Sequence, residues 1–152
     1  MERDDRESIR ALVARSGRLL DDERFEDYLA LFAAEGQYLL EATSAEIGRD
    51  MMWLSLNRAE LADLFQEWPL HVRDPAARTH LVAVDEISVD GAAGRAFSTF
   101  TIYRTDERGR SEFYCIGRYE DDVCTEGTAW KIKRRRARLI TRLLVTPTPL
   151  PV

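Results

Sequence analysis

The sequence contains few of the residues that hold metal ions. Among its 152 residues are two cysteines, Cys115 and Cys124, and two histidines, His71 and His80. An iron–sulfur site of the Cys-x-His plus Cys-x-x-His type needs these residues in two close pairs, and zinc sites need similar clusters. The four residues stand apart and form no CxxC, so we expect no metal, cofactor or redox centre in this chain.

Long apolar runs are also missing. No segment approaches the roughly 20 apolar residues that cross a bilayer. The start, MERDDRE, is charged, whereas a signal peptide is basic and then apolar. Cysteines in a chain without an export signal are normally reduced. We therefore expect a cytoplasmic protein with no membrane segment and no disulfide.

An excess of positive charge is missing as well. The 22 basic and 27 acidic side chains leave a net charge of −5, which argues against general nucleic-acid binding. The length is that of one domain with a single core, so we interpret residues 1–152 as one domain. Three prolines in residues 145–152 exclude a helix or a continuous strand there. We expect this segment to be a C-terminal arm over a neighbouring subunit, or else a frayed end.

Helical periodicity dominates the first half of the chain. Apolar residues recur at helical spacing in three segments, 8–20, 25–32 and 57–68. Asn57 is a suitable N-cap for the third helix, and Glu60, three residues on, completes a capping box. Gly36 is expected to end the second helix, before a first strand at 37–41. Residues 42–56 have no clear period and are consistent with a strand, a buried turn or the start of a helix.

The second half indicates strands. Residues 80–89, 95–105, 111–121 and 129–144 are rich in β-branched or alternating side chains and are separated by short turns with glycine. Helices followed by hairpin-connected strands predict an α+β domain, with the helices packed on one face of a strongly curved, mostly antiparallel sheet. The strands are apolar on both faces, so we expect the second face to be covered by another subunit or by the coiling of the sheet itself.

Four segments in a fixed order resemble a known family. They are FEDYLALF followed by GQY (25–38), RTHLV (78–82), FYCIGRYED (113–121) and WKIKRRR (130–136). From about Ile9 to Leu144 the chain resembles the small (β) subunit of Rieske-type aromatic-ring-hydroxylating dioxygenases. The W-x-I element is common in the nuclear transport factor 2-like fold, whereas GRYED ahead of the tryptophan is more specific.

The resemblance implies a fold and a division of labour. The family fold, nuclear transport factor 2-like or SnoaL-like, is a cone-shaped curved sheet backed by helices. Such a β subunit forms a trimeric base and assembles with a large α subunit, commonly as an α3β3 hexamer. The α subunit holds the Rieske [2Fe-2S] cluster, the mononuclear iron and the substrate pocket. The implied function of this chain is non-catalytic support of an oxygenase of aromatic-compound catabolism. The chain departs from the family in its short length and in the apolar character of Met51–Trp68.

No residue is expected to be catalytic under this hypothesis. The expected structural or interface residues are Trp68, His80, Arg118, Tyr119, Glu120, Arg134 and Arg136. His80 would need a partner carboxylate and a pocket to act as a general acid or base, so it is interpreted as a hydrogen-bonding or interface residue. His71 is expected in a solvated loop. Met51, Met52 and Trp53 are interpreted as core or, if exposed, as a contact site for the α subunit.

The run KIKRRRAR at 131–138 is the strongest local charge feature. Because a strand sends alternate side chains to opposite faces, the run is expected to divide. One face is expected to carry Lys131, Lys133 and Arg135, and the other Arg134, Arg136 and Arg138. A divided patch without interleaved aromatics does not suit nucleic acid. We expect it to pair with an acidic partner subunit or with acidic side chains of this chain, namely Glu120, Asp121, Asp122, Asp21 or Asp22.

Two other functions are compatible with the same residues. The first is a stand-alone enzyme of this fold, a ketosteroid-isomerase- or dehydratase-like proton-transfer catalyst. It would use a carboxylate base and tyrosine hydroxyls that stabilise an enolate, drawn from Asp21, Asp22, Tyr38, Tyr103 and Tyr114. The second is a ligand-binding module without catalysis. A deep closed pocket with a buried, perturbed Asp or His would identify the enzyme, and a pocket without a titratable group would identify the module.

Overall fold

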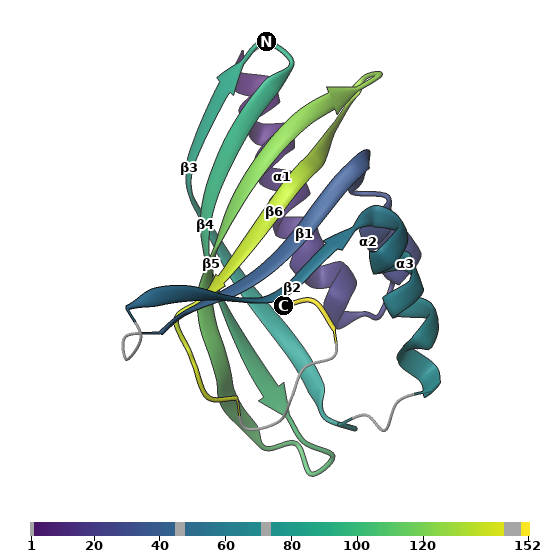
Figure 1. Cartoon of the computed structure of the whole chain (residues 1–152), viewed down its shortest axis with the longest axis vertical. Coiled ribbons are helices and arrows are strands. Elements are labelled where there is room, and N and C mark those ends of the chain that lie inside the picture. Colours follow the sequence, from purple (N-terminus) through teal and green to yellow (C-terminus); the bar gives the residue numbers. More distant parts are fainter. Residues whose placement is uncertain (1, 45–47, 71–73, 145–149) are drawn as a thin grey trace.

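The computed structural model places helices on one face of a six-stranded sheet (Figure 1). It describes residues 2–44, 48–70, 74–144 and 150–152. The helices are α1 (Glu2–Asp21), α2 (Phe25–Leu29) and α3 (Arg58–Glu67), and a 3₁₀ turn, η1 (Trp68–Leu70), follows α3. The strands are β1 (Phe32–Ser44), β2 (Arg49–Asn57), β3 (Ala77–Asp90), β4 (Ala93–Thr105), β5 (Ser111–Glu126) and β6 (Ala129–Leu139). No helix in these segments is long and apolar enough to cross a membrane.

The strands lie in the order β2-β1-β6-β5-β4-β3. Adjacent strands are antiparallel except β1 and β6, which are parallel. The three hairpins from β3 to β6 turn at Gly91, Gly109 and Gly127, where φ is 61°, 80° and 61°. Glycine adopts this left-handed region without steric cost. The predicted α+β class, with helices on a curved and mostly antiparallel sheet, is confirmed.

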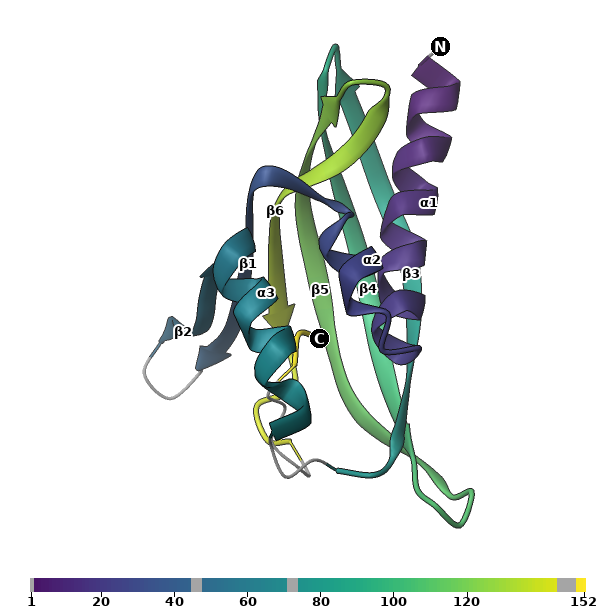
Figure 2. The same ribbon diagram turned by 90° about the vertical axis from the view of Figure 1, so that its right-hand side faces the viewer.

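The three helices all lie on the same face of the sheet. α1 runs along β3 and β4, while α2 and α3 lie nearer β1 (Figure 2). Arg6 of α1 donates a hydrogen bond to the carbonyl of Ile87 on β3 at 2.5 Å, which ties the helix to the sheet. At the start of α3, the Asn57 side chain accepts from the Glu60 N–H and the Glu60 carboxylate accepts from the Asn57 N–H. The predicted capping box is therefore confirmed.

An aromatic-rich core fills the space between helices and sheet. Its buried members include Ile9, Tyr28, Tyr38, Phe100, Ile102, Tyr114, Tyr119 and Ile132. Leu150 and Val152 belong to the same core, and the Tyr38 hydroxyl accepts a hydrogen bond from the Val152 N–H at 2.9 Å. The described end of the predicted arm thus packs against its own chain. Residues 145–149 and His71 lie outside the described residues.

One expectation about the first strand is wrong. Helix α2 ends at Leu29, and Gly36 lies inside β1 instead of ending a helix. A Cβ at position 36 would lie 2.9 Å from the Ala33 carbonyl oxygen and 2.9 Å from the Phe32 Cβ. The register of β1 with β6 also shifts between Phe32 and Gln37. The glycine therefore serves a tight bend within the strand.

Other boundaries also differ from the sequence prediction, and β5 extends to Glu126 where 121 was expected. The ambiguous segment 42–56 contains strand β2, which pairs with β1. The last strand ends at Leu139, five residues earlier than predicted. The N–H groups of Ile140 and Thr141 both bond to the carbonyl of Ile116, and this doubling interrupts the regular hydrogen-bond pattern of the antiparallel ladder.

Candidate functional site

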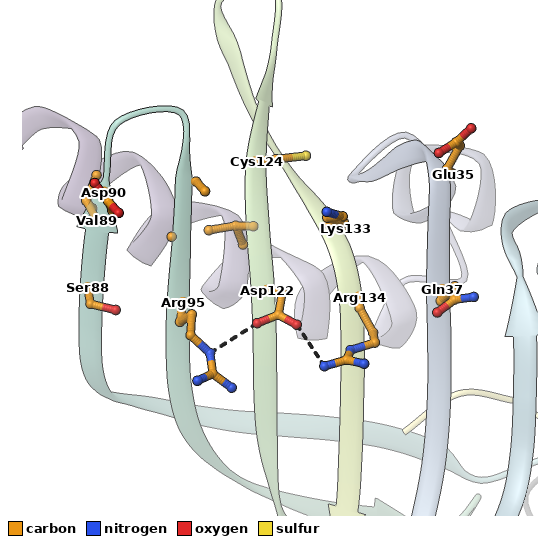
Figure 3. Close-up of a pocket in the computed structure, with 13 residues that line it drawn as sticks. Glu35, Gln37, Ser88, Val89, Asp90, Arg95, Asp122, Cys124, Lys133 and Arg134 are labelled. Atoms are coloured by element: carbon orange, nitrogen blue, oxygen red, sulfur yellow. Dashed lines mark hydrogen bonds and ion pairs between the residues drawn. The ribbon is translucent and has the colours of Figure 1, made fainter.

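A row of polar residues crosses the face of the sheet that the helices leave uncovered. The register places Ser88, Arg95, Asp122, Arg134 and Gln37 side by side on five strands. Asp122 binds both arginines, with Oδ1 3.1 Å from Arg95 Nε and Oδ2 3.0 Å from Arg134 Nη2 (Figure 3). One carboxylate thus orients two guanidinium groups and leaves each of them partly exposed.

This row forms the floor of a pocket of about 700 Å³. α1 lies behind the sheet in Figure 3, so the pocket opens on the face that the helices leave uncovered. Its charged lining residues are Arg95, Lys133 and Arg134 together with Glu35, Asp90 and Asp122. A depression lined by charges of both signs is better suited to contact a polar surface of another protein than to bind a small apolar ligand.

A second charged cluster lies further along the same face. Glu41 of β1 and Glu120 of β5 bind Arg136 and Arg138 of β6 from both sides, at N···O distances of 3.2 to 3.8 Å. Arg136 Nε is 3.2 Å from Glu41 Oε1 but is not aligned for a hydrogen bond. The exposed Arg118 lies beside Arg138 in register.

The end of the face beyond the last residue of β6 carries several large apolar side chains. The exposed large apolar side chains there are Leu81, Tyr103, Phe113 and Ile140. Leu81 is 57% exposed and Phe113 48%, and the Tyr103 and Phe113 rings meet edge to face with centroids 6.3 Å apart. Large exposed apolar side chains that cluster on one face are typical of interaction sites. We call the two charged clusters and this apolar end the helix-free face.

The structure separates the predicted interface residues into two groups. Four of them lie together on the helix-free face, namely Arg118, Glu120, Arg134 and Arg136. The other three, Trp68, His80 and Tyr119, have side chains buried on the helix-covered side. Trp68 Nε1 donates to Glu23 at 3.0 Å, and Tyr119 stacks on Phe100 with centroids 4.3 Å apart. In this chain these three can act only as structural residues or in an interior site.

The basic run divides between the faces, but not as the alternation predicts. Arg134, Arg136 and Arg138 share the helix-free face and pair with Asp122, Glu120 and Glu41. Lys133 is exposed and has no register partner between Ile132 and Arg134, so β6 bulges there. Because the extra residue shifts the alternation, Arg135 is buried while Lys133 is not. The prediction that these two share a face is wrong.

Arg135 is the largest fully buried side chain. It forms a bidentate pair with Asp121 at 2.8 and 2.9 Å, donates to Ser16 Oγ at 2.8 Å, and lies 4.0 Å from the centre of the Tyr119 ring. Although burial opposes its charge, Asp121 holds the pKa of Arg135 above its usual value. Burial also raises the pKa of Tyr28 nearby to about 12. The interior therefore contains a charged pair among neutral hydroxyls.

The sequence reasoning missed a second interior feature, a pair between His80 and Asp21. His80 Nδ1 lies 2.5 Å from Asp21 Oδ1, and the backbone N–H of His80 donates to Asp21 Oδ2 at 2.8 Å. Their side chains are 3% and 12% exposed. The residues are 59 positions apart, so no local spacing indicates the pair. The sequence feature that relates to this pair is Gly17, one helical turn before Asp21 on α1. A Cβ at position 17 would lie 2.9 Å from His80 Cβ, so a glycine there lets α1 pack closely on His80.

The tyrosines and acidic residues of the enzyme alternative do not form one cluster. Tyr38 and Tyr114 are buried, whereas Tyr103 is exposed on the helix-free face. Asp22 pairs with the exposed Arg18 instead of facing the interior. Across the described segments, no group of three or more His, Cys, Asp or Glu side chains is placed to hold a metal ion.

Comparison with known proteins identifies the family. The profile of the SnoaL-like domain matches residues 1–136. The β subunit of the methanesulfonate monooxygenase hydroxylase of Methylosulfonomonas methylovora is 28% identical over 160 residues, which cover 99% of this chain and 88% of that protein. The β subunit of the 2-aminobenzenesulfonate 2,3-dioxygenase of an Alcaligenes species is 26% identical over 146 residues, which cover 95% and 97%.

A solved structure shows the same fold. It is a provisionally named β subunit of an aromatic-ring-hydroxylating dioxygenase from Novosphingobium aromaticivorans. It superposes with a TM-score of 0.79 at 21% identity, over 95% of this chain and 94% of that one. The resemblance stated from the sequence is confirmed.

Proposed function

This chain belongs to the SnoaL-like domain family, and we propose that it is the non-catalytic β subunit of a ring-hydroxylating oxygenase. Both relatives described above are β subunits of oxygenases, and each is similar to this chain over at least 95% of its length. The large subunit of such a complex would carry the Rieske [2Fe-2S] cluster, the mononuclear iron and the substrate. This chain would stabilise the assembly in the cytoplasm.

The observation that carries the proposal is the helix-free face. Its charged clusters combine preoriented arginines with carboxylates, and its lower end exposes Leu81, Tyr103 and Phe113. Stable protein interfaces combine apolar contacts with charged and polar groups, and this face offers both. We propose that other copies of this chain and the large subunit cover this face, as a β trimer within an α3β3 hexamer.

The proposal is tested by the mass of the particle in solution. The chain is purified alone and after co-expression with the iron-bearing large subunit of the same operon, and each sample is measured by light scattering and native mass spectrometry. We expect a trimer alone or a complex of six chains. A monomer or dimer that does not bind the large subunit would refute the proposal.

Charge-reversal variants locate the interface. Arg134→Glu with Arg136→Glu places repulsive charges beside Asp122 and Glu120, so assembly should weaken by at least tenfold. The matched control is Arg3→Glu with Arg15→Glu, two exposed positions on α1 that change the net charge equally. If both pairs weaken assembly to the same extent, the effect reflects net charge and the helix-free face is not the interface.

A further inference from the structure

Large apolar side chains on the surface form two separate groups. Apart from Leu143 after β6, the exposed ones in the described part of the chain are Met52 and Trp53 on β2 and the apolar end of the helix-free face with Leu81, Tyr103, Phe113 and Ile140. We propose that the two groups bind each other between neighbouring copies of this chain, so that β2 of one copy covers the apolar end of the next. This inference rests on the proposed β-subunit function and specifies the contact within its trimer.

A trimer of identical chains limits which surfaces can meet. A patch that binds its own copy gives a two-fold dimer, whereas a ring of three is closed by contacts between two different patches. The two apolar groups fulfil this condition, because β2 is at one edge of the sheet and the apolar end lies on β3, β4 and β5 towards the other. Charged residues separate them in register, namely Arg118, Arg138 and Glu41.

Met52 and Trp53 lie on a strand that projects from the molecule. β2 pairs with β1 alone, and it extends away from the rest of the sheet on the side opposite α1 (Figure 2). The register with β1 skips Trp53, so β2 bulges there. A bulge at a sheet edge redirects side chains, and here two consecutive apolar side chains are 52% and 36% exposed. Methionine and tryptophan are both enriched in protein interfaces.

The apolar end is a continuous uncharged surface that can receive these side chains. Two neighbouring rows cross β3, β4 and β5 in register, Leu81–Thr101–Ile116 and Thr79–Tyr103–Phe113. Ile140 adjoins the first row, because its N–H binds the carbonyl of Ile116. Neither row contains a charged side chain, so an apolar partner can cover both rows without removing an ion from water.

Cysteine pairs test which surfaces meet. Two differently tagged copies, one with Met52→Cys and one with Leu81→Cys, are co-expressed with the large subunit. Both also carry Cys124→Ser, which removes the half-buried thiol and leaves only the buried Cys115. The purified particle is treated with a short bismaleimide, and linked chains are identified by mass spectrometry. We expect a link between the two tagged copies, and none when either variant is expressed alone, because a head-to-tail contact joins unlike surfaces.

Acidic substitutions measure the strength of the contact. Trp53→Glu places a charge against the uncharged rows, so it should weaken the trimer of this chain by at least about tenfold. The matched control is Ser55→Glu, an exposed position on the same strand that changes the net charge equally and should leave the trimer unchanged. Leu81→Glu should act like Trp53→Glu. Circular dichroism checks that each variant is folded.

The outcomes distinguish this contact from the proposed function. If the particle contains three copies but the mixed pair does not link, or if one variant links to itself, the contact is overturned while the β-subunit function is unaffected. The same holds if Trp53→Glu and Ser55→Glu weaken the trimer equally. If Leu81→Glu removes the large subunit and leaves the trimer intact, the large subunit covers the apolar end and the contact is overturned. A monomer that does not bind the large subunit overturns both.

Discussion

The buried pair between Arg135 and Asp121 allows a quantitative test of the interior. Both side chains are fully buried, and two hydrogen bonds of 2.8 and 2.9 Å join them. Asp121→Asn keeps the shape of the site but leaves the guanidinium charge uncompensated. Breaking one side of such a pair costs roughly 3–5 kcal/mol of unfolding free energy. For a domain of this size the loss lowers the melting temperature by roughly 6–20 °C.

The double variant Asp121→Leu with Arg135→Met separates the charge from the packing. It removes both charges and fills much of their volume, so we expect it to be more stable than Asp121→Asn by roughly 2 kcal/mol or more. Ser16 does not become an unpaired group in this variant, because its hydroxyl also donates to the Val13 carbonyl at 2.6 Å. Urea denaturation followed by circular dichroism measures all three free energies. A loss of less than about 1 kcal/mol of unfolding free energy for Asp121→Asn would show that the buried charge of Arg135 does not need Asp121.

Three further predictions concern separate parts of the chain. Asn57→Ala removes the cap of α3 and should lower the unfolding free energy by about 1 kcal/mol, measured by thermal denaturation, and an unchanged midpoint would contradict the capping geometry. Arg104 holds the pKa of the Asp74 carboxyl below its usual 3.8, so this pair should stabilise the fold at neutral pH and lose its effect as the pH falls through the lowered pKa. The urea midpoints of Asp74→Asn and the unaltered chain should therefore converge in acid, and a constant difference would refute this. Cys115 is buried with its thiol pKa raised to about 12, so mass spectrometry should find native-state alkylation at the half-buried Cys124 and not at Cys115.

Local signals in the sequence predicted most of the fold. The capping box at Asn57 and Glu60 and the glycine turns of the three hairpins each depend on a few neighbouring residues, and the structure has all of them. The boundaries that failed depend on distant partners. β2 is a strand because it pairs with β1, and β6 ends where Ile140 and Thr141 share one carbonyl of β5.

The candidate site shows the same difference between local signals and contacts with distant partners. The family resemblance led to Arg118, Glu120, Arg134 and Arg136, which the register then placed on one face. The same reasoning could not indicate that a bulge at Lys133 shifts the alternation of β6 and buries Arg135. A bulge is decided by how one strand fits its neighbour, and the sequence of a single strand does not contain that information.

The sequence alone determined the class of the fold, the acidic balance and the family, because these depend on composition, periodicity and the order of motifs. Only the tertiary structure decided that Asp21, at the end of the first helix, meets His80 across 59 residues. It also decided that the uncovered face of the sheet combines charged clusters with an apolar end. Both results follow from how the helices and strands pack, and packing brings together side chains that no local pattern relates.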